Sequence, residues 1–256
     1  MSGEEAERYR APALDKGLDI LELLAGTEEG LTQAEIAKAL GRTPNEIYRM
    51  LDRLVRRGYV SRSSGDLYEL SLKLFALAHR HEPMRRLVSH AMPVMRRFAR
   101  EAGQACHLAV YDRGAVIVVA QVDSPEYWSL GVRVGAHLGL LGTGSGQALL
   151  AFSTPRERAF MLEEYERLPH DHAPVDLDRR LDALRRDGYA ATDSQQIEGV
   201  RNLSIPILGP QGTAIAALTC PYLRRIDVAG EADRDRVLKL LAETGREIAR
   251  SAGTAS

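Results

Sequence analysis

Apolar residues recur at helical spacing in three consecutive segments near the start of the chain. Thr32, three residues before Glu35, is typical of a capping box at the start of the second segment. Pro44, directly after Thr43, suits the start of the third, because the first helical position needs no N–H donor. The pattern predicts helices over residues 14–25, 33–40 and 44–57.

The pattern then changes to strand-like alternation. Tyr59–Arg62 and Leu67–Leu70 alternate apolar and polar residues, and Ser63–Asp66 between them is typical of a hairpin loop. Three helices followed by a hairpin is the order of a winged helix-turn-helix, a module that places its last helix in the DNA major groove. The first part of the chain is therefore predicted to bind DNA.

The local charge supports this prediction, although the formal net charge of the 256-residue chain is only −1. Seven basic residues lie between Lys38 and Arg62, against the two acidic residues Glu46 and Asp52. A basic run alone is equally typical of a solvated helix face. The prediction therefore depends on the order of the helices and the hairpin.

The third helix and the hairpin carry the candidate DNA contacts. The helix face opposite the apolar stripe is polar, and Asn and Arg on such a face can bridge adenine and guanine by paired hydrogen bonds. At the helix start a hydroxyl or N–H can contact phosphate, and the hairpin can meet the flanking backbone. The alternative is a solvated helix in a small protein-docking domain. The candidates are Thr43, Asn45, Arg49, Arg53, Arg56, Arg62, Ser63 and Ser64.

The rest of the chain has a mixed pattern of strands and helices, which predicts an α+β fold. Strands are predicted over residues 107–111, 115–122, 202–208 and 214–219, and helices over 83–102, 147–152, 155–168, 177–187 and 232–252. The predicted organisation is a disordered arm (1–11), a winged helix-turn-helix domain (12–71), a linker helix (72–83) and a mixed α/β domain (84–253).

No signal peptide and no apolar run of membrane-spanning length is recognisable, and two cysteines are too few for a disulfide scaffold, so a cytoplasmic protein is expected. Cys106 and His107 are neighbours on a predicted strand and point to opposite faces. One zinc site can therefore not easily use both, and Cys106, His107 and Cys220 are interpreted as structural residues. No cofactor is predicted.

A glycine-rich segment, Gly142–Gly146, precedes an apolar helix. Its N–H groups can hold a carboxylate at the helix N-terminus, whereas the alternative is that the glycines only make a tight turn. Gln147 replaces the third glycine of a dinucleotide fingerprint, and Thr143 replaces the first glycine of a nucleophile elbow. An enzymatic site is not expected, because Ser145 lacks an identifiable base.

Several segments resemble the IclR family of bacterial transcriptional regulators: ALDKGLDILELLAGTEEGLTQAEIAKALGRTPNEIYRMLDRLVRRGYVSR, GQACHLAVYDRGAVIVVAQVDSP, TGSGQALLAF, LRRDGYAATDSQQIEGVRNLSIPI and TAIAALTC. The resemblance covers nearly the whole chain. It departs from the family at Pro44–Tyr48, where relatives commonly have Lys or Ser at the helix start and Ser before His or Tyr.

The resemblance implies a GAF-like effector domain, a homodimer or a dimer of dimers, and control by a small organic, sugar or aromatic acid. The glycine-rich loop borders the effector pocket in relatives, and the segment 125–135 roofs it. Trp128 is expected either to stack on the ligand or to pack ordinarily, and Arg133 can pair with a carboxylate. The implied effector-binding residues are Trp128, Arg133, Thr143, Gly144, Ser145, Thr192, Asp193, Asn202 and Thr219.

The predicted function is therefore a ligand-responsive regulator of a catabolic operon, a repressor or an activator, that reads a palindromic double-stranded operator as a symmetric oligomer. Two alternatives remain open. One is a constitutive DNA-binding protein with a purely structural C-terminal domain. The other is an enzyme whose helical front is a docking module.

Overall fold

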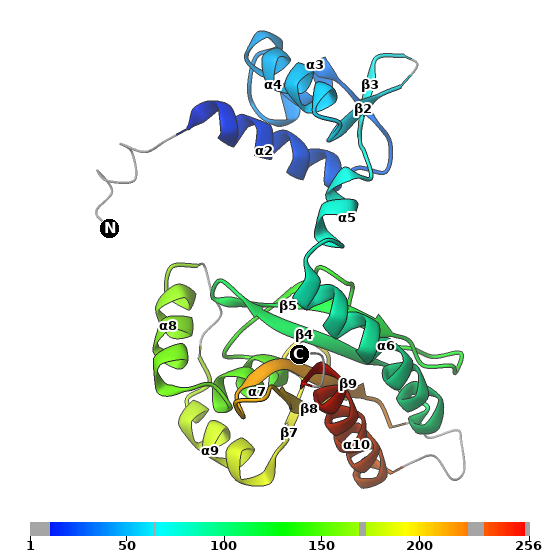
Figure 1. Ribbon diagram of the computed structural model, residues 1–256, viewed down its shortest axis with the longest axis vertical. Coiled ribbons are helices and arrows are strands. Elements are labelled where there is room, and N and C mark those ends of the chain that lie inside the picture. Colours follow the sequence, from blue (N-terminus) through cyan, green and yellow to red (C-terminus); the bar gives the residue numbers. More distant parts are fainter. Residues whose placement is uncertain (1–10, 64, 169–172, 225–232, 254–256) are drawn as a thin grey trace. The chain divides into compact units, whose positions relative to one another are not determined.

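A computed structural model describes residues 11–63, 65–168, 173–224 and 233–253 (Figure 1). The chain divides between Glu82 and Pro83 into two compact units. Each unit has its own cluster of buried apolar side chains. The predicted disordered arm, residues 1–11, lies outside the described residues except for Ala11, which precedes the first helix.

The first unit contains helices and a small antiparallel sheet of strand order β1-β3-β2. Its core gathers Ile20, Ile36, Ile47 and Leu51 from the helices and Val60 from the hairpin. The elements are α2 (Pro12–Ala25), β1 (Leu31–Thr32), α3 (Gln33–Ala39), α4 (Pro44–Arg56), β2 (Val60–Arg62), β3 (Leu67–Leu70) and α5 (Lys73–Ala78).

Local sequence signals determine where these helices begin and end. Thr32 and Glu35 form the predicted capping box at the start of α3. After α3 and α4, Gly41 (φ +61°) and Gly58 (φ +72°) adopt the left-handed backbone conformation that other residues disfavour. The strand β1 was not predicted, because two residues are too short to produce an alternating pattern; it pairs Leu31 with Tyr68 of β3.

The second unit is built on a six-stranded antiparallel sheet of order β6-β5-β4-β9-β8-β7. Its elements are α6 (Glu82–Ala102), β4 (Cys106–Asp112), β5 (Ala115–Val122), β6 (His137–Leu138), α7 (Gly144–Ala151), α8 (Pro155–Tyr165), α9 (Leu177–Asp187), β7 (Ala190–Asp193), β8 (Arg201–Leu208), β9 (Ala214–Tyr222) and α10 (Arg234–Gly253).

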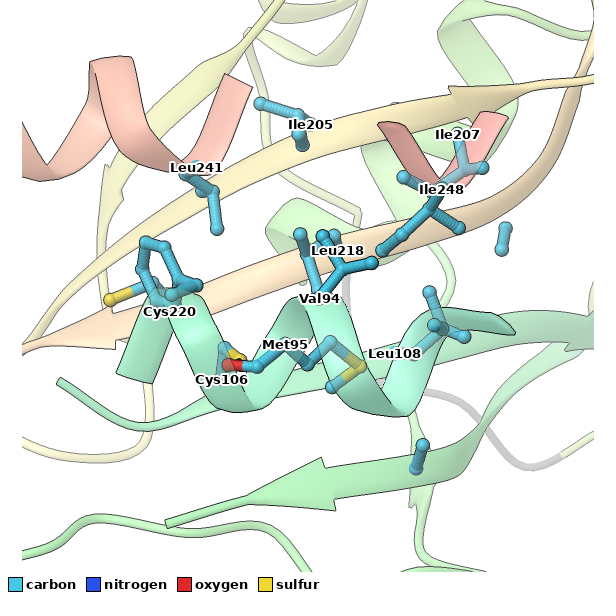
Figure 2. Packing of buried hydrophobic residues seen from close by; sticks show 14 of the residues in the cluster. Val94, Met95, Cys106, Leu108, Ile205, Ile207, Leu218, Cys220, Leu241 and Ile248 are labelled. Atoms are coloured by element: carbon cyan, nitrogen blue, oxygen red, sulfur yellow. The ribbon is translucent and has the colours of Figure 1, made fainter. Parts of the chain in front are cut away.

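The two faces of this sheet have different partners. On one face, Cys106, Leu108, Leu218 and Cys220 pack with side chains from α6 and α10 (Figure 2). On the other face, Ala109 and Ala217 pack with residues of α7, α8 and α9. Because neighbouring residues of a strand point to opposite faces, His107 and Thr219 face α7.

The predicted α+β fold is confirmed: a winged helix-turn-helix is followed by a short helix and a mixed α/β unit. Several details besides β1 differ. The helix predicted over residues 72–83 is represented by α5, which ends at Ala78, and the helix predicted over 155–168 ends at Tyr165. The short strands β6 and β7 were missed, and the helix predicted from Gln147 begins at Gly144. Among the described residues, no helix is both long and apolar enough to cross a membrane.

Candidate DNA-binding surface and candidate effector site

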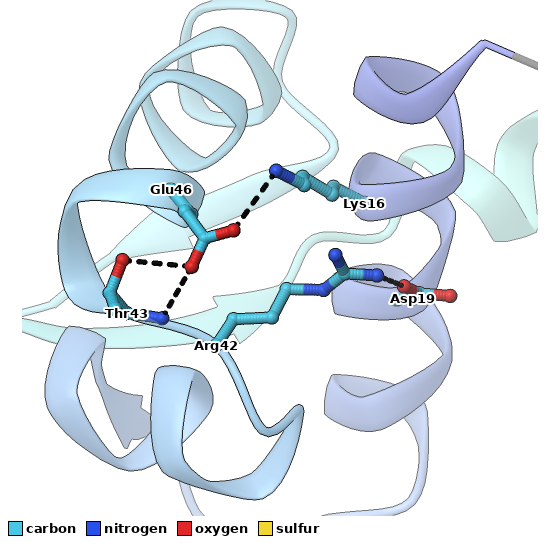
Figure 3. A network of polar contacts seen from close by, with 5 residues as sticks. All are labelled: Lys16, Asp19, Arg42, Thr43 and Glu46. Carbon is cyan, nitrogen blue, oxygen red and sulfur yellow. Dashed lines mark hydrogen bonds and ion pairs between the residues drawn. The ribbon is translucent and has the colours of Figure 1, made fainter.

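The start of α4 is fixed by Glu46. Its Oε2 accepts hydrogen bonds from the Thr43 N–H and hydroxyl, each at 2.8 Å, and its Oε1 lies 3.4 Å from Lys16 Nζ of α2 (Figure 3). These hydrogen bonds, that from the Thr43 backbone first, lower the pKa of Glu46 to about 2. Arg42 is bound to Asp19 of α2 at 2.8 Å. The helix N-terminus is thus held against α2.

Thr43 was predicted to offer its hydroxyl or N–H to a phosphate. In the structure, both hydrogens are donated to Glu46 instead. A phosphate oxygen accepts hydrogen bonds and cannot supply one. Thr43 therefore serves as the helix cap, and a phosphate contact would require it to release Glu46.

The outward face of α4 presents polar side chains to solvent. Asn45, Arg49 and Arg53 are exposed, while Ile47 and Leu51 on the opposite face are buried. Within the described part of the chain, Arg49 and Arg53 form no ion pair. Arg56 differs, because its Nε lies 2.9 Å from Asp52 Oδ2, so its charge is partly compensated.

The β2–β3 hairpin supplies a further cation next to α4. Arg62 is bound to Asp66 at 2.7 Å, which raises the pKa of Arg62, and its guanidinium lies 5.7 Å from the ring centroid of Tyr68. Ser63 is exposed, and Ser64 lies outside the described residues.

Tyr48 was not among the predicted contacts. It is 56% exposed on α4, directly before Arg49. The signal for it was an exposed aromatic residue beside the apolar stripe of the predicted helix.

In the second unit, a chain of buried hydroxyl groups lies under the start of α7. Ser145 Oγ is 2.8 Å from Thr219 Oγ1, and Thr219 donates to Ser204 Oγ at 2.7 Å. The imidazole of His107 joins this chain, with Nε2 3.5 Å from Ser145 Oγ. All four side chains are buried. Strands β4, β9 and β8 bring them together, because His107, Thr219 and Ser204 are cross-strand neighbours.

His107 is uncharged at neutral pH. Burial lowers the pKa of His107 to about 4, since the charged form is disfavoured away from water. Its Nδ1 is buried and has no hydrogen-bond partner within the described residues.

The first turn of α7 is closely packed. Thr143 accepts a hydrogen bond from the Gly146 N–H at 3.1 Å and donates to the Gly139 carbonyl at 2.7 Å, so its hydroxyl is the helix cap. A Cβ on Gly146 would lie 2.0 Å from the Leu140 oxygen, and a Cβ on Gly144 would lie 2.3 Å from Ser204 Oγ. These approaches explain why the helix begins at Gly144 rather than at Gln147: the glycines are its first turn, not a loop before it.

The structure brings together part of the predicted effector set. Gly144, Ser145 and Thr219 belong to the cluster, and the Cβ position of Gly144 is 3.8 Å from Thr192 Oγ1. Thr192 pairs with Asn202 across β7 and β8. Asp193 is exposed instead, with Oδ1 3.8 Å from Arg201 Nε.

Trp128 and Arg133 are not in the cluster. Trp128 is 68% exposed, and its ring centroid lies 6.1 Å from that of the neighbouring Tyr127. Arg133 is also exposed. The segment that carries them does approach the cluster. The Val132 N–H donates a hydrogen bond to the side chain of Gln121, which is the cross-strand neighbour of His107.

His107 and Ser204 were missed as effector candidates. The signal for both is a single polar residue at an inward position of an otherwise apolar strand, as in Ala105–Val110 and Leu203–Ile207. The sequence alone indicates a structural role for His107 rather than an effector contact. Within the described part of the chain, no group of three His, Cys, Asp or Glu residues could hold a metal ion.

A cavity lies elsewhere on the second unit. It has a volume of about 800 Å³ and is bordered by the β4–β5 turn, β6 and the end of α8. Arg113, His137 and Glu164 are among its lining residues, and none of the predicted effector-binding residues is.

Each unit matches one of the two domains of a single protein family. The IclR helix-turn-helix domain matches residues 13–64, and the bacterial transcriptional regulator IclR C-terminal domain matches residues 83–250. The HTH-type transcriptional regulator BhcR of Paracoccus denitrificans is 32% identical over 239 residues, which cover 90% of this chain and 85% of that protein. The transcriptional repressor IclR of Escherichia coli is 25% identical over 215 residues, covering 81% of this chain and 78% of that protein. These relatives are named as regulators, not as enzymes.

Solved structures share the fold. An IclR transcriptional regulator from Alicyclobacillus acidocaldarius has a TM-score of 0.73 at 24% identity, covering 96% of this chain and 100% of that one. An IclR homologue from Microbacterium hydrocarbonoxydans, complexed with 4-hydroxybenzoate, has a TM-score of 0.76 at 23% identity, covering 94% and 98%.

Proposed function

The chain belongs to the IclR family of bacterial transcriptional regulators, and on that premise we propose that it controls a catabolic operon in response to a small organic acid. In this proposal α4 and the β2–β3 hairpin read a palindromic operator, and the first turn of α7 binds the acid. A bacterial regulator of this kind acts in the cytoplasm, where the chromosome lies. The observation that carries this proposal is the outward face of α4, where Asn45 is exposed and Arg49 and Arg53 form no ion pair with any residue that the structure describes.

The side chains of this face suit base recognition. Arg49 and Arg53 lie one turn apart on α4, and an arginine can donate two hydrogen bonds to guanine. Asn45 can bridge adenine in the same way. Arg56 and Arg62 already contact carboxylates within the unit. We assign them to the phosphate backbone, because a phosphate contact requires a positive charge but not the geometry of paired hydrogen bonds to a base. Ser63, next to Arg62, is assigned to the same backbone. Ser64 lies outside the described residues, and its assignment to this backbone rests on the sequence.

Selection of binding sequences from random duplex DNA by the intact chain tests this proposal. The expected outcome is a palindromic site whose affinity falls steeply as salt rises. Arg49→Ala should weaken binding to that site by roughly 1–3 kcal/mol and relax the preference at one position in each half-site. Arg113→Ala, which removes an exposed arginine of the second unit, is the matched control and should leave affinity unchanged. Absence of any enriched sequence would contradict the proposal.

The start of α7 is proposed as the acid site. The first N–H groups of a helix lack intrahelical acceptors, and the Thr143 hydroxyl accepts that of Gly146. The N–H groups of Gly144 and Ser145 are left for a carboxylate, which the helix dipole also favours. Thr192, Asn202 and Thr219 lie on the same face of the sheet and are proposed as further polar contacts. Asp193, Trp128 and Arg133 are exposed, so they contact the acid only if the segments that carry them close over it.

Ser145→Trp tests the acid site, because a large side chain at this buried position would displace the groups around the first turn of α7. DNA binding by the wild type is measured with a panel of aliphatic, sugar and aromatic acids, including 4-hydroxybenzoate because one homologue is complexed with it. An acid that changes operator affinity should also raise the melting temperature of the wild type. The variant should bind the operator and lose the response. A normal response in Ser145→Trp would overturn this assignment.

We also propose that the chain acts as a homodimer, or as a dimer of dimers, since a two-fold operator is read by a two-fold protein. Exposed apolar side chains support a partner for the first unit. Leu14 and Leu18 of α2 are exposed, as are Leu72, directly before α5, and Phe75 of α5. Repression and activation are both compatible with these features.

A further inference from the structure

We propose that His107 determines which acids the effector site accepts, because its Nδ1 accepts a hydrogen bond from a hydroxyl group of the effector. The site then selects hydroxylated carboxylic acids over the same acids without that hydroxyl. This inference rests on the proposed acid site at the start of α7.

The direction of the hydrogen bonds follows from counting hydrogens along the buried chain. Thr219 donates its one hydroxyl hydrogen to Ser204. The 2.8 Å contact between Ser145 and Thr219 must therefore be donated by Ser145. Ser145 then has no hydrogen left for His107, so across the 3.5 Å contact Nε2 donates and Ser145 Oγ accepts.

This order fixes the tautomer of the imidazole. A neutral imidazole carries one hydrogen, and here that hydrogen is on Nε2. Nδ1 is left with a lone pair that can only accept a hydrogen bond. It is buried and has no partner among the described residues, which is an unfavourable state for a polar atom. The missing partner must be an O–H or N–H donor.

The charges of the cluster narrow the class of ligand. Its side chains are three hydroxyl groups and one neutral imidazole, so the cluster itself holds no cation for an anion. The attraction for an anion comes from the N–H groups and dipole of α7, which suits a single carboxylate. A carboxylate at α7 together with a donor for His107 describes a hydroxycarboxylic acid.

The tautomer can be measured without any effector. Long-range proton–nitrogen correlation spectra of the intact chain labelled with ¹⁵N-histidine distinguish Nε2–H from Nδ1–H imidazoles by their nitrogen shifts. The signal of His107 is assigned by its loss in His107→Gln, and exposed His137 serves as a reference that exchanges between tautomers. An Nε2–H signal for His107 is expected. An Nδ1–H signal would overturn the proposal, because the nitrogen left as acceptor would then face Ser145.

Ligand selectivity is measured by calorimetric titration of the intact chain with two matched pairs, lactate against propionate and 4-hydroxybenzoate against benzoate. In at least one pair, the hydroxylated acid should bind the wild type roughly 3- to 10-fold more tightly, the range expected for one added hydrogen bond. His107→Leu should remove this preference. His107→Gln, which keeps an acceptor, should retain part of it.

The outcomes separate the two proposals. If none of the four acids binds the wild type, the acid site itself fails and the selectivity falls with it. If the acids bind and Ser145→Trp abolishes binding, but the members of each pair bind equally, only the role of His107 is wrong. An unchanged preference in His107→Leu has the same meaning, provided that this variant still binds the selected operator and is therefore folded.

Discussion

Single polar residues inside apolar strands form the buried polar cluster of the second unit. His107, Ser204 and Thr219 each interrupt a buried strand, and the sheet register aligns them in one row. A sequence pattern identifies such residues one at a time, but it does not reveal that three strands distant in the chain place them side by side. For this reason Thr219 was predicted through the family resemblance, whereas His107 and Ser204 were not.

The depressed pKa of His107 predicts how stability depends on pH. Its pKa is about 4 in the folded chain against 6.5 in the unfolded chain, so the unfolded state binds more protons between these values. The corresponding stability is present above pH 6.5 and is lost as the pH falls to 4, by about 3 kcal/mol in total. His107→Gln removes this dependence. Urea unfolding followed by circular dichroism at pH 7 and pH 4.5 should show a larger loss for the wild type than for the variant.

The carboxylate of Glu46 acts in a lower pH range. Its pKa is about 2 in the folded chain and 4.5 without its partners, so its contribution is present above pH 4.5 and lost as the pH falls through 2. Glu46→Gln keeps an acceptor for Thr43 but no charge for Lys16. Its helical signal should therefore change less than that of the wild type in an acid titration. Equal acid profiles would show that the ionised carboxylate does not stabilise α4.

At the scale of elements, turn and cap residues predicted helix boundaries well in the first unit. Thr32, Pro44 and Gly58 have direct local effects on the backbone, so α3 and α4 were identified from sequence. The predicted start of α7 was wrong because its position depends on packing against distant residues rather than on a local signal. Glycine is usually a loop residue, and only the approach of Leu140 and Ser204 to the backbone explains glycines in a first helical turn.

This close approach predicts unequal effects of two similar substitutions. Gly146→Ala places a Cβ 2.0 Å from a backbone oxygen, and the resulting shift should destabilise the chain by about 1–3 kcal/mol. Gly139→Ala, in the same region, meets no atom within 4 Å and should be neutral or slightly stabilising. Chemical unfolding of both variants measures the difference. Equal stabilities would mean that the first turn of α7 relaxes freely.

At the scale of the whole molecule, hydrophobic periodicity predicted two domains of different fold, a winged helix-turn-helix and a mixed α/β domain. Strongly periodic elements such as α4, β5 and α9 were found close to their final bounds, whereas β1, β6 and β7 were missed. β1 and β6 have only two residues and β7 (Ala190–Asp193) does not alternate, so these strands depend on pairing with a neighbour rather than on their own pattern.

For the proposed homodimer, the exposed apolar residue Phe75 of α5 predicts a response to mutation. Phe75 is 62% exposed on a helix that has no buried residue, so Phe75→Ser should weaken a subunit contact and shift the chain toward monomer. Phe160→Ser, which changes a 55% exposed phenylalanine of α8, is the control and should leave the mass unchanged. Sedimentation velocity across a concentration series measures both. Identical profiles for Phe75→Ser and wild type would exclude α5 from the contact.

The rate at which the two thiols of the second unit are alkylated measures how often this unit opens transiently. Cys106 and Cys220 are both buried, and the first unit contains no cysteine. Burial raises the pKa of both thiols, to about 12 for Cys106. Alkylation by iodoacetamide therefore requires the sheet to separate from α6 or α10, whatever the DNA-binding half is doing. An acid that binds the second unit should slow this labelling, while operator DNA alone, if the two halves open independently, should leave its rate unchanged.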